Sequence, residues 1–168
     1  MKDRLVTYRD FTVGNRQHRA LAKVLHQCFS VVMPEWLCTV TYYYSTDSHR
    51  DGPNILATIS TQPQYRQTGI TFYPAFWGSQ WGPRHYAETF VHELFHSYTQ
   101  VLADEGSKVL DCWTNDPGPF VDLGKRGVVA ANEAVVSDLT RFFMRTQYTG
   151  ALRRNFEARM LKLGVRDV

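Results

Sequence analysis

The sequence predicts an α+β fold, in which a small mixed or antiparallel sheet is followed by a helical C-terminal part. Strand patterns rich in β-branched and aromatic residues fall before residue 78, and the two longest helical patterns fall after it. The chain has 168 residues, of which 43% are hydrophobic, so it is long enough to bury a core of its own. We therefore expect residues 1–168 to form one domain.

The first half of the chain contains the expected strands and one helix. Residues 5–13 read as a strand, and residues 16–32 read as a helix because apolar side chains recur there every three or four positions. Pro34 ends that helix. Three further strands are expected at residues 37–45, 55–62 and 69–77. Pro74 favours a sheet edge for the last of them, because proline cannot donate a ladder hydrogen bond.

The second half is expected to contain three helices, at residues 85–103, 127–147 and about 151–163. A segment rich in Gly, Pro and Asp, residues 104–127, separates the first two. A connection of 24 residues is long for a compact domain. We therefore expect this segment to be a functional lid or a mobile loop.

The cysteine spacing, the N-terminal residues and the lengths of apolar runs limit the kinds of site and the cellular location that we expect. The three cysteines form no C-x-x-C pair, so they indicate neither a cysteine zinc site nor a redox motif. The charged N-terminus lacks the apolar core of a signal peptide, and no apolar run is long enough to span a bilayer. We expect a cytoplasmic protein with no membrane partner, although secretion of a processed form stays open.

The net charge of +3 gives only a weak preference for acidic partners. The C-terminal stretch, residues 151–168, is locally basic. It could contact nucleic acid, but a solvated helix face is the simpler interpretation, and we favour it.

The motif His92-Glu93-Leu94-Phe95-His96 predicts a metal site. Residues four apart on a helix lie on one face, about 5–6 Å apart at Cβ, so both imidazoles can bind one zinc ion. Glu93 lies about 100° further round the helix and can reach a water held by the metal, as a general base must. Leu94 and Phe95 are expected to pack.

The alternative is that the two histidines match the motif by coincidence. Apolar residues form a stripe along the same helix, namely Phe90, Val91, Leu94, Phe95, Tyr98, Val101 and Leu102. His92 and His96 fall on nearly the opposite side, where a core histidine would not be expected. This placement favours the metal site over the coincidence.

Through His92-Glu93-Leu94-Phe95-His96 the chain resembles the zincin metallopeptidases. The resemblance implies a zincin-like fold, a zinc cofactor and a peptide or protein substrate. In zincins an edge strand precedes the motif helix and binds extended substrate. Residues 69–77 occupy that place in the chain order, although they can equally be one more strand of the sheet.

A catalytic zinc needs a third protein ligand. No histidine follows His96, which excludes the metzincin arrangement. The segment from Asn132-Glu133 to Ser137-Asp138 resembles the gluzincin pattern Asn-Glu-x-x-Ser-Asp, with one extra residue between the two pairs. The resemblance makes Glu133 the third ligand. Asp138 and Asn132 are expected to support a zinc ligand, and Asp138 is the alternative third ligand.

Other side chains are weaker candidates for the site. The loop carboxylates and one cysteine rank below Glu133 as ligands, namely Asp104, Glu105, Asp111, Asp116 and Cys112. Tyr148, His85 and a residue of the 104–127 segment are candidates for stabilising the oxyanion of a tetrahedral intermediate, and nothing in the sequence chooses among them.

The expected function is a zinc-dependent metallopeptidase, with His92, His96 and Glu133 as ligands and Glu93 as general base. One alternative is a zincin-like binding module that does not cleave. A second is a DNA-associated protease, as among SprT-like zincins, in which the basic C-terminal helix contacts phosphates. A third is a metal-dependent hydrolase that acts on a non-peptide bond.

Overall fold

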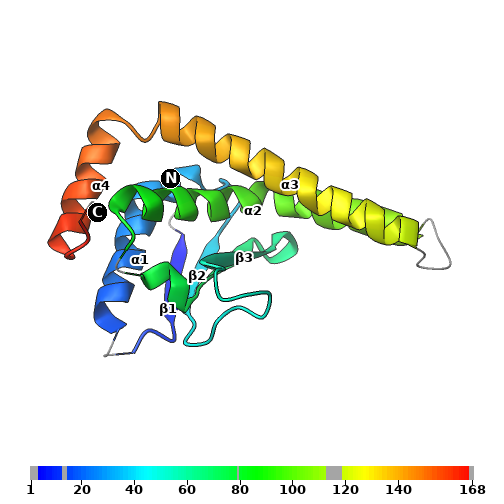
Figure 1. Cartoon of the computed structure of the whole chain (residues 1–168). Coiled ribbons are helices and arrows are strands. Elements are labelled where there is room, and N and C mark those ends of the chain that lie inside the picture. Colours follow the sequence, from blue (N-terminus) through cyan, green and yellow to red (C-terminus); the bar gives the residue numbers. More distant parts are fainter. Residues whose placement is uncertain (1–3, 13–14, 79, 113–118, 167–168) are drawn as a thin grey trace.

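The computed structural model describes residues 4–12, 15–78, 80–112 and 119–166, and its strands form one four-stranded sheet (Figure 1). The strands are β1 (Leu5–Arg9), β2 (Thr39–Tyr44), β3 (Ala57–Gln62) and β4 (Gln67–Phe72). Their order across the sheet is β1-β2-β4-β3. β1, β2 and β4 are parallel, and β3 is antiparallel to β4. The prediction of an α+β fold with a small mixed sheet is therefore confirmed.

The helices cover most of the remaining chain. The α-helices are α1 (Arg16–Phe29), α2 (Pro83–Cys112), α3 (Pro119–Thr146) and α4 (Gly150–Lys162). Short 3₁₀-helices are η2 (Ser30–Val32), η3 (Pro63–Tyr65) and η4 (Pro74–Trp77). Within the described part of the chain, no helix combines the length and apolar character needed to cross a membrane.

The core lies between one face of the sheet and the helices. Alternate side chains of β2 and β4 are fully buried, as the period of two in a strand requires: Val40, Tyr42, Ile70 and Phe72. Aromatic side chains of three helices complete this layer: Phe29 of α1, Phe90 of α2 and Phe156 of α4. The first half of α2 is thereby anchored on the sheet by apolar burial, the largest favourable contribution to folding.

The edge strand differs from the sequence prediction. β4 lies between β2 and β3, so residues 69–77 are not an edge strand, and β3 is the edge beside α2. Pro74 misled the prediction because it lies outside β4 and begins η4, where its missing N–H leaves no ladder bond unmade.

The prediction that residues 104–127 form a lid or a mobile loop is also wrong. α2 continues to Cys112 and α3 begins at Pro119, so the two helices form an antiparallel hairpin, and only residues 113–118 of that segment lie outside the described residues. The glycines of this segment that the structure describes lie inside the helices. A Cβ added to Gly124 would lie 3.1 Å from Cδ1 of Leu110, so the helices pack closely there, whereas one added to Gly106 would make an ordinary contact at 3.7 Å with Cγ1 of Val128.

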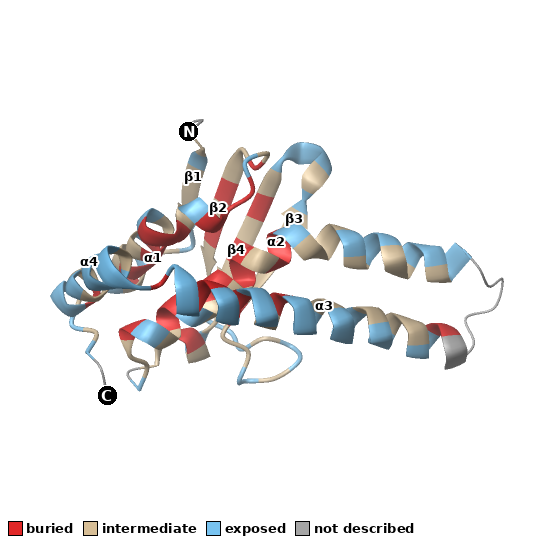
Figure 2. Ribbon diagram, turned by 90° about the horizontal axis from the view of Figure 1, so that it is seen from above, coloured by how far each residue is buried: buried red, intermediate tan, exposed pale blue. Residues whose placement is uncertain are grey.

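The hairpin has an inner half (residues 83–100 and 132–146) and an outer half (residues 101–112 and 119–131). Figure 2 shows buried residues concentrated in the inner half, where the helices meet the rest of the protein, and exposed residues dominating the outer half. Every buried residue of α2 lies at or before Ser97.

Candidate metal centre

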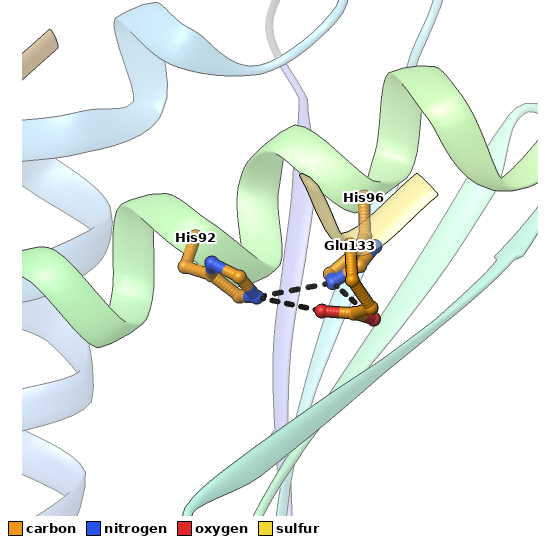
Figure 3. A group of neighbouring side chains, drawn as sticks. All are labelled: His92, His96 and Glu133. Carbon is orange, nitrogen blue, oxygen red and sulfur yellow. Dashed lines mark hydrogen bonds and ion pairs between the residues drawn. The ribbon is translucent and has the colours of Figure 1, made fainter. Parts of the chain in front are cut away.

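α2 brings His92 and His96 together on one face of its inner half (Figure 3). Their Nε2 atoms lie 3.2 Å apart. The neighbouring residues Phe90, Val91 and Leu94 are at most 1% exposed, so the backbone that carries the histidines is held firmly in the core. The predicted apolar stripe is therefore buried in its first part, whereas Tyr98 and Leu102 are exposed, and His96 is itself buried rather than on a solvent-facing side.

Glu133 comes from α3, which packs against α2 with one side. Its side facing α2 carries residues spaced three or four apart, namely Val128, Asn132, Val136, Thr140 and Phe143, of which the last three are buried. Glu133 follows Asn132 and so lies at the edge of this line. Its Oε1 is 3.3 Å from Nε2 of His96, and its Oε2 is 3.5 Å from Nε2 of His92.

The three donor atoms have the separations that one zinc ion requires. Ligands at about 2.0–2.2 Å from zinc in a tetrahedral site lie about 3.3–3.5 Å from each other. The corresponding distances among His92, His96 and Glu133 are 3.2, 3.3 and 3.5 Å. These residues also form the group of His, Cys, Asp and Glu side chains, among those the structure describes, whose ligand atoms are close enough for a metal ion. Two imidazoles and one carboxylate suit zinc in donor type as well.

Asn132 contacts the far nitrogen of His96. Its amide nitrogen lies 3.3 Å from Nδ1 of His96, and its buried Oδ1 has no hydrogen-bond partner among the described residues. Turning the amide by 180°, which exchanges two atoms of nearly equal size, places Oδ1 where it accepts a hydrogen bond from Nδ1–H. In that arrangement Nε2 of His96 presents its lone pair to a cation.

Glu93 is buried although it carries a carboxyl group. It is 9% exposed and lines the same cleft as His92, His96 and Glu133. Burial, together with the neighbouring charge of Glu133, raises the pKa of Glu93 from 4.5 to about 8. A cation held by the three neighbours would oppose this rise, because positive charge favours the carboxylate.

Burial also lowers the pKa of His96 below its usual 6.5. The proximity of His92 lowers it further, whereas the carboxylate of Glu133 acts in the opposite direction. Neutral imidazole is the form that binds a metal, so the environment of His96 favours the ligand form.

His92, His96 and Glu133, here called the cluster, line a cleft of about 830 Å³ between the edge of the sheet and the hairpin. One wall consists of residues 54–59, which include the start of β3. The other walls are the histidine face of α2 and the Glu133 face of α3. A cleft of this size accommodates a short segment of extended chain.

The structure keeps Asp138 apart from the cluster. Asp138 Oδ1 instead forms an ion pair with Nη2 of Arg141 at 2.9 Å, and its side chain is 74% exposed. The extra residue in the segment explains this, because five positions on a helix correspond to a rotation of about 140°. Of the two supporting candidates, Asn132 contacts a histidine of the cluster and Asp138 does not.

The weaker ligand candidates also lie outside the cluster. Asp104, Glu105 and Asp111 pair with Gln100, Lys108 and Lys125 respectively. Cys112 is exposed at the end of α2, and Asp116 lies outside the described residues.

Of the two residues named as candidates for stabilising an oxyanion, His85 lines the cleft and Tyr148 does not. Tyr148 is 5% exposed and packs beside Phe29 and Phe156, away from the cleft lining. His85 lines the cleft and stacks on Trp81 at 3.9 Å between ring centroids.

Sequence reasoning missed several residues of the cleft wall. Thr140 and Arg141 line it from α3, and Leu56 to Ile59 line it from the edge of the sheet. The first two lie seven and eight positions after Glu133, so helical spacing was a signal that could have found them.

Comparisons of the chain with models of known protein families, with curated proteins and with solved structures found no match.

Proposed function

We propose that the protein is a zinc-dependent metallopeptidase, in which His92, His96 and Glu133 hold the metal and Glu93 is the general base. The observation that carries the proposal is the triangle of Nε2, Nε2 and carboxylate oxygen atoms with sides of 3.2, 3.3 and 3.5 Å. Without a shared cation this arrangement turns two imidazole nitrogens toward each other and toward one carboxylate. A single tetrahedral zinc ion accounts for all three separations.

The roles of the protein groups follow from their positions. Zinc, when bound, lowers the pKa of a water molecule and polarises a scissile carbonyl. Glu93 accepts the proton of the attacking water and delivers it to the leaving amine, from its buried position in the cleft wall. Asn132 orients His96 through Nδ1.

The edge strand β3 supports a peptide as substrate. β3 pairs with β4 on one side, and within the described chain its other side has no strand partner. An extended peptide can add to such an edge through main-chain hydrogen bonds. Because residues 54–59 line the cleft, a peptide bound along β3 would pass the metal cluster. β3 thus takes the role that the zincin resemblance gave to residues 69–77.

Two alternatives are less well supported. A module that only holds zinc has no use for Glu93, and burying a carboxyl group is costly. A nucleic-acid partner would need the basic side chains of α4, but no residue of α4 is among those that line the cleft. We therefore propose a peptide or protein substrate.

The first test is the zinc content of purified protein by elemental analysis. Wild type is expected to hold about one zinc ion per chain. Glu133→Ala should lose the ion or bind it much more weakly, because two ligands remain. Asp138→Ala is the matched control on the same helix and should bind zinc like wild type, since Asp138 pairs with Arg141.

Zinc retained in Glu133→Ala, or lost in Asp138→Ala, would contradict the ligand set. Wild type that takes up no metal even when zinc is supplied would remove the proposed function altogether. If zinc binds as expected, a peptide cleavage screen with a Glu93→Gln control tests the chemistry.

A further inference from the structure

We propose that Arg141 is a specificity-determining residue that binds a carboxylate of the substrate close to the scissile bond. The inference rests on the proposed function and names a substrate class for the same site. It starts from the charges of the cleft. Among the described residues that line it, Arg141 is the lone lysine or arginine, whereas Glu88, Glu93 and Glu133 are acidic.

The position of Arg141 follows from helical spacing on α3. Glu133, Ser137, Thr140 and Arg141 all line the cleft, and they are separated by four, three and one positions. They therefore form one continuous face of the helix. Arg141 is eight residues beyond Glu133, which corresponds to about 12 Å along the helix axis.

This separation defines which part of a substrate reaches Arg141. An extended peptide advances about 3.3 Å per residue. A carboxylate bound by Arg141 would therefore lie within about four residues of a carbonyl placed at the metal cluster. It can be the side chain of Asp or Glu, or the free C-terminus of a short peptide.

The contacts of Arg141 orient its side chain without using all of its donors. Nε donates to the carbonyl oxygen of Ser137 at 3.3 Å, and Nη2 pairs with Asp138 at 2.9 Å. A guanidinium has five N–H donors, so others remain for a ligand. The side chains of Arg141 and Asp138 are 62% and 74% exposed, and an ion pair this exposed is weak and readily rearranged.

The ion pair makes a second, opposite effect measurable. Asp138 competes with a substrate carboxylate for the same guanidinium. Removing the charge of Asp138 should therefore strengthen binding of acidic peptides, whereas removing the charge of Arg141 should weaken it. General electrostatic attraction would respond equally to Arg145, which lies one turn further on α3, is exposed, and is not among the cleft-lining residues.

The test measures binding to zinc-loaded protein that carries Glu93→Gln, so that cleavage does not interfere. The probes are fluorescein-labelled short random peptides in three sets: with a free C-terminus, with an amidated C-terminus, and amidated with one fixed glutamate in place of glutamine. Fluorescence anisotropy gives the affinity of each set. Amidation removes the terminal carboxylate, and the glutamate set reports the side-chain carboxylate.

We expect one carboxylate set to bind about tenfold more tightly than its neutral counterpart, as for a hydrogen-bonded charge pair. Arg141→Gln should reduce this ratio to about one, Arg145→Gln should leave it unchanged, and Asp138→Asn should increase it. A ratio near one in the parent protein, absence of measurable binding, or equal losses in the two arginine variants would overturn the inference.

Cleavage of the same peptides by wild type, followed by mass spectrometry, is scored separately. If nothing is cleaved while the carboxylate preference depends on Arg141, the proposed peptidase function fails, and what stands is carboxylate binding by Arg141 in this cleft. If peptides are cleaved without such a preference, the peptidase function stands and the role of Arg141 fails.

Discussion

The inner and outer halves of the α2–α3 hairpin belong to the same two helices, yet different forces hold them. The inner half packs on the sheet, and Phe90 and Leu94 are at most 1% exposed there. In the outer half, Leu102 is 75% exposed and Leu123 is 62% exposed. The outer helices mainly support each other, through the contacts at Gly106 and Gly124 and the ion pair of Lys125 with Asp111 at 2.5 Å.

The difference shows where a precise site can be built. Metal ligands must be held to within a fraction of an ångström, and residues on a helix anchored by a packed core meet that requirement. The candidate metal ligands His92, His96 and Glu133 lie in the inner half, close to where the buried residues of α2 end at Ser97. The outer half, which lacks such support, is expected to open locally at a lower free energy than the inner half.

The largest expected difference between the halves concerns catalysis. Glu93→Gln should lower kcat/KM for a cleaved peptide by about 10²–10⁴-fold, because the proposed general base is lost while the proposed zinc ligands remain. Glu105→Gln is the matched control on the same helix, since Glu105 is exposed in the outer half and pairs with Lys108. It should keep wild-type kinetics and zinc content. Equal losses in both variants would show that the effect does not come from the site.

The next difference concerns stability. Leu94→Ala should lower the free energy of unfolding by about 2–5 kcal/mol, because it leaves a cavity in the core. Leu102→Ala, two turns further along α2, should change it by no more than about 0.5 kcal/mol, because Leu102 is 75% exposed. Denaturant unfolding of both variants measures this contrast. A large loss for Leu102→Ala would mean that the outer half is covered in solution.

Glycines of the outer half should give smaller effects on stability, and the effect at Gly127 should have the opposite sign. A Cβ at Gly127 meets nothing within 4 Å, so Gly127→Ala should stabilise the protein by about 0.5–1 kcal/mol through helix propensity. Gly124→Ala should gain less or lose stability, because its Cβ would lie 3.1 Å from Leu110. Thermal unfolding compares the two, and Gly124→Ala more stable than Gly127→Ala would contradict the close packing at Gly124.

The smallest effect is expected for the ion pair of Lys125 and Asp111. Their side chains are 36% and 53% exposed, so a double-mutant cycle should give a coupling of about 0.2–1 kcal/mol. The coupling should decrease as salt is added. A coupling that is large and independent of salt would indicate that the outer half is less exposed to water than its surface suggests.

Local patterns in the sequence predicted the helices and strands well, because periodicity reflects which face of an element is buried. The predictions failed where glycine and proline were read as breakers. Gly106 and Gly124 lie inside long helices, and Pro74 lies after a strand rather than within it. Whether such a residue ends a helix or strand depends on the segment it packs against. That segment is distant in sequence and cannot be identified from the adjacent residues.

Some residues of the candidate site could likewise be predicted from local sequence, and others could not. The spacing of His92 and His96 places them on one face of any helix, and Glu93 beside them follows from the same geometry. The packing of α3 across α2 decides which carboxylate meets the histidines. Glu133 lies 3.3 and 3.5 Å from them, whereas Asp138 pairs with Arg141.

The order of the elements and the pair of histidines with its glutamate could be predicted from the sequence, because these depend on contacts within a few residues of the chain. Packing was needed to establish which strand is the sheet edge, that residues 104–127 belong largely to two packed helices, and which carboxylate faces the histidines. The physical reason is that these features arise from packing between segments far apart in the chain, where the rotation of one helix against another selects the side chains that meet.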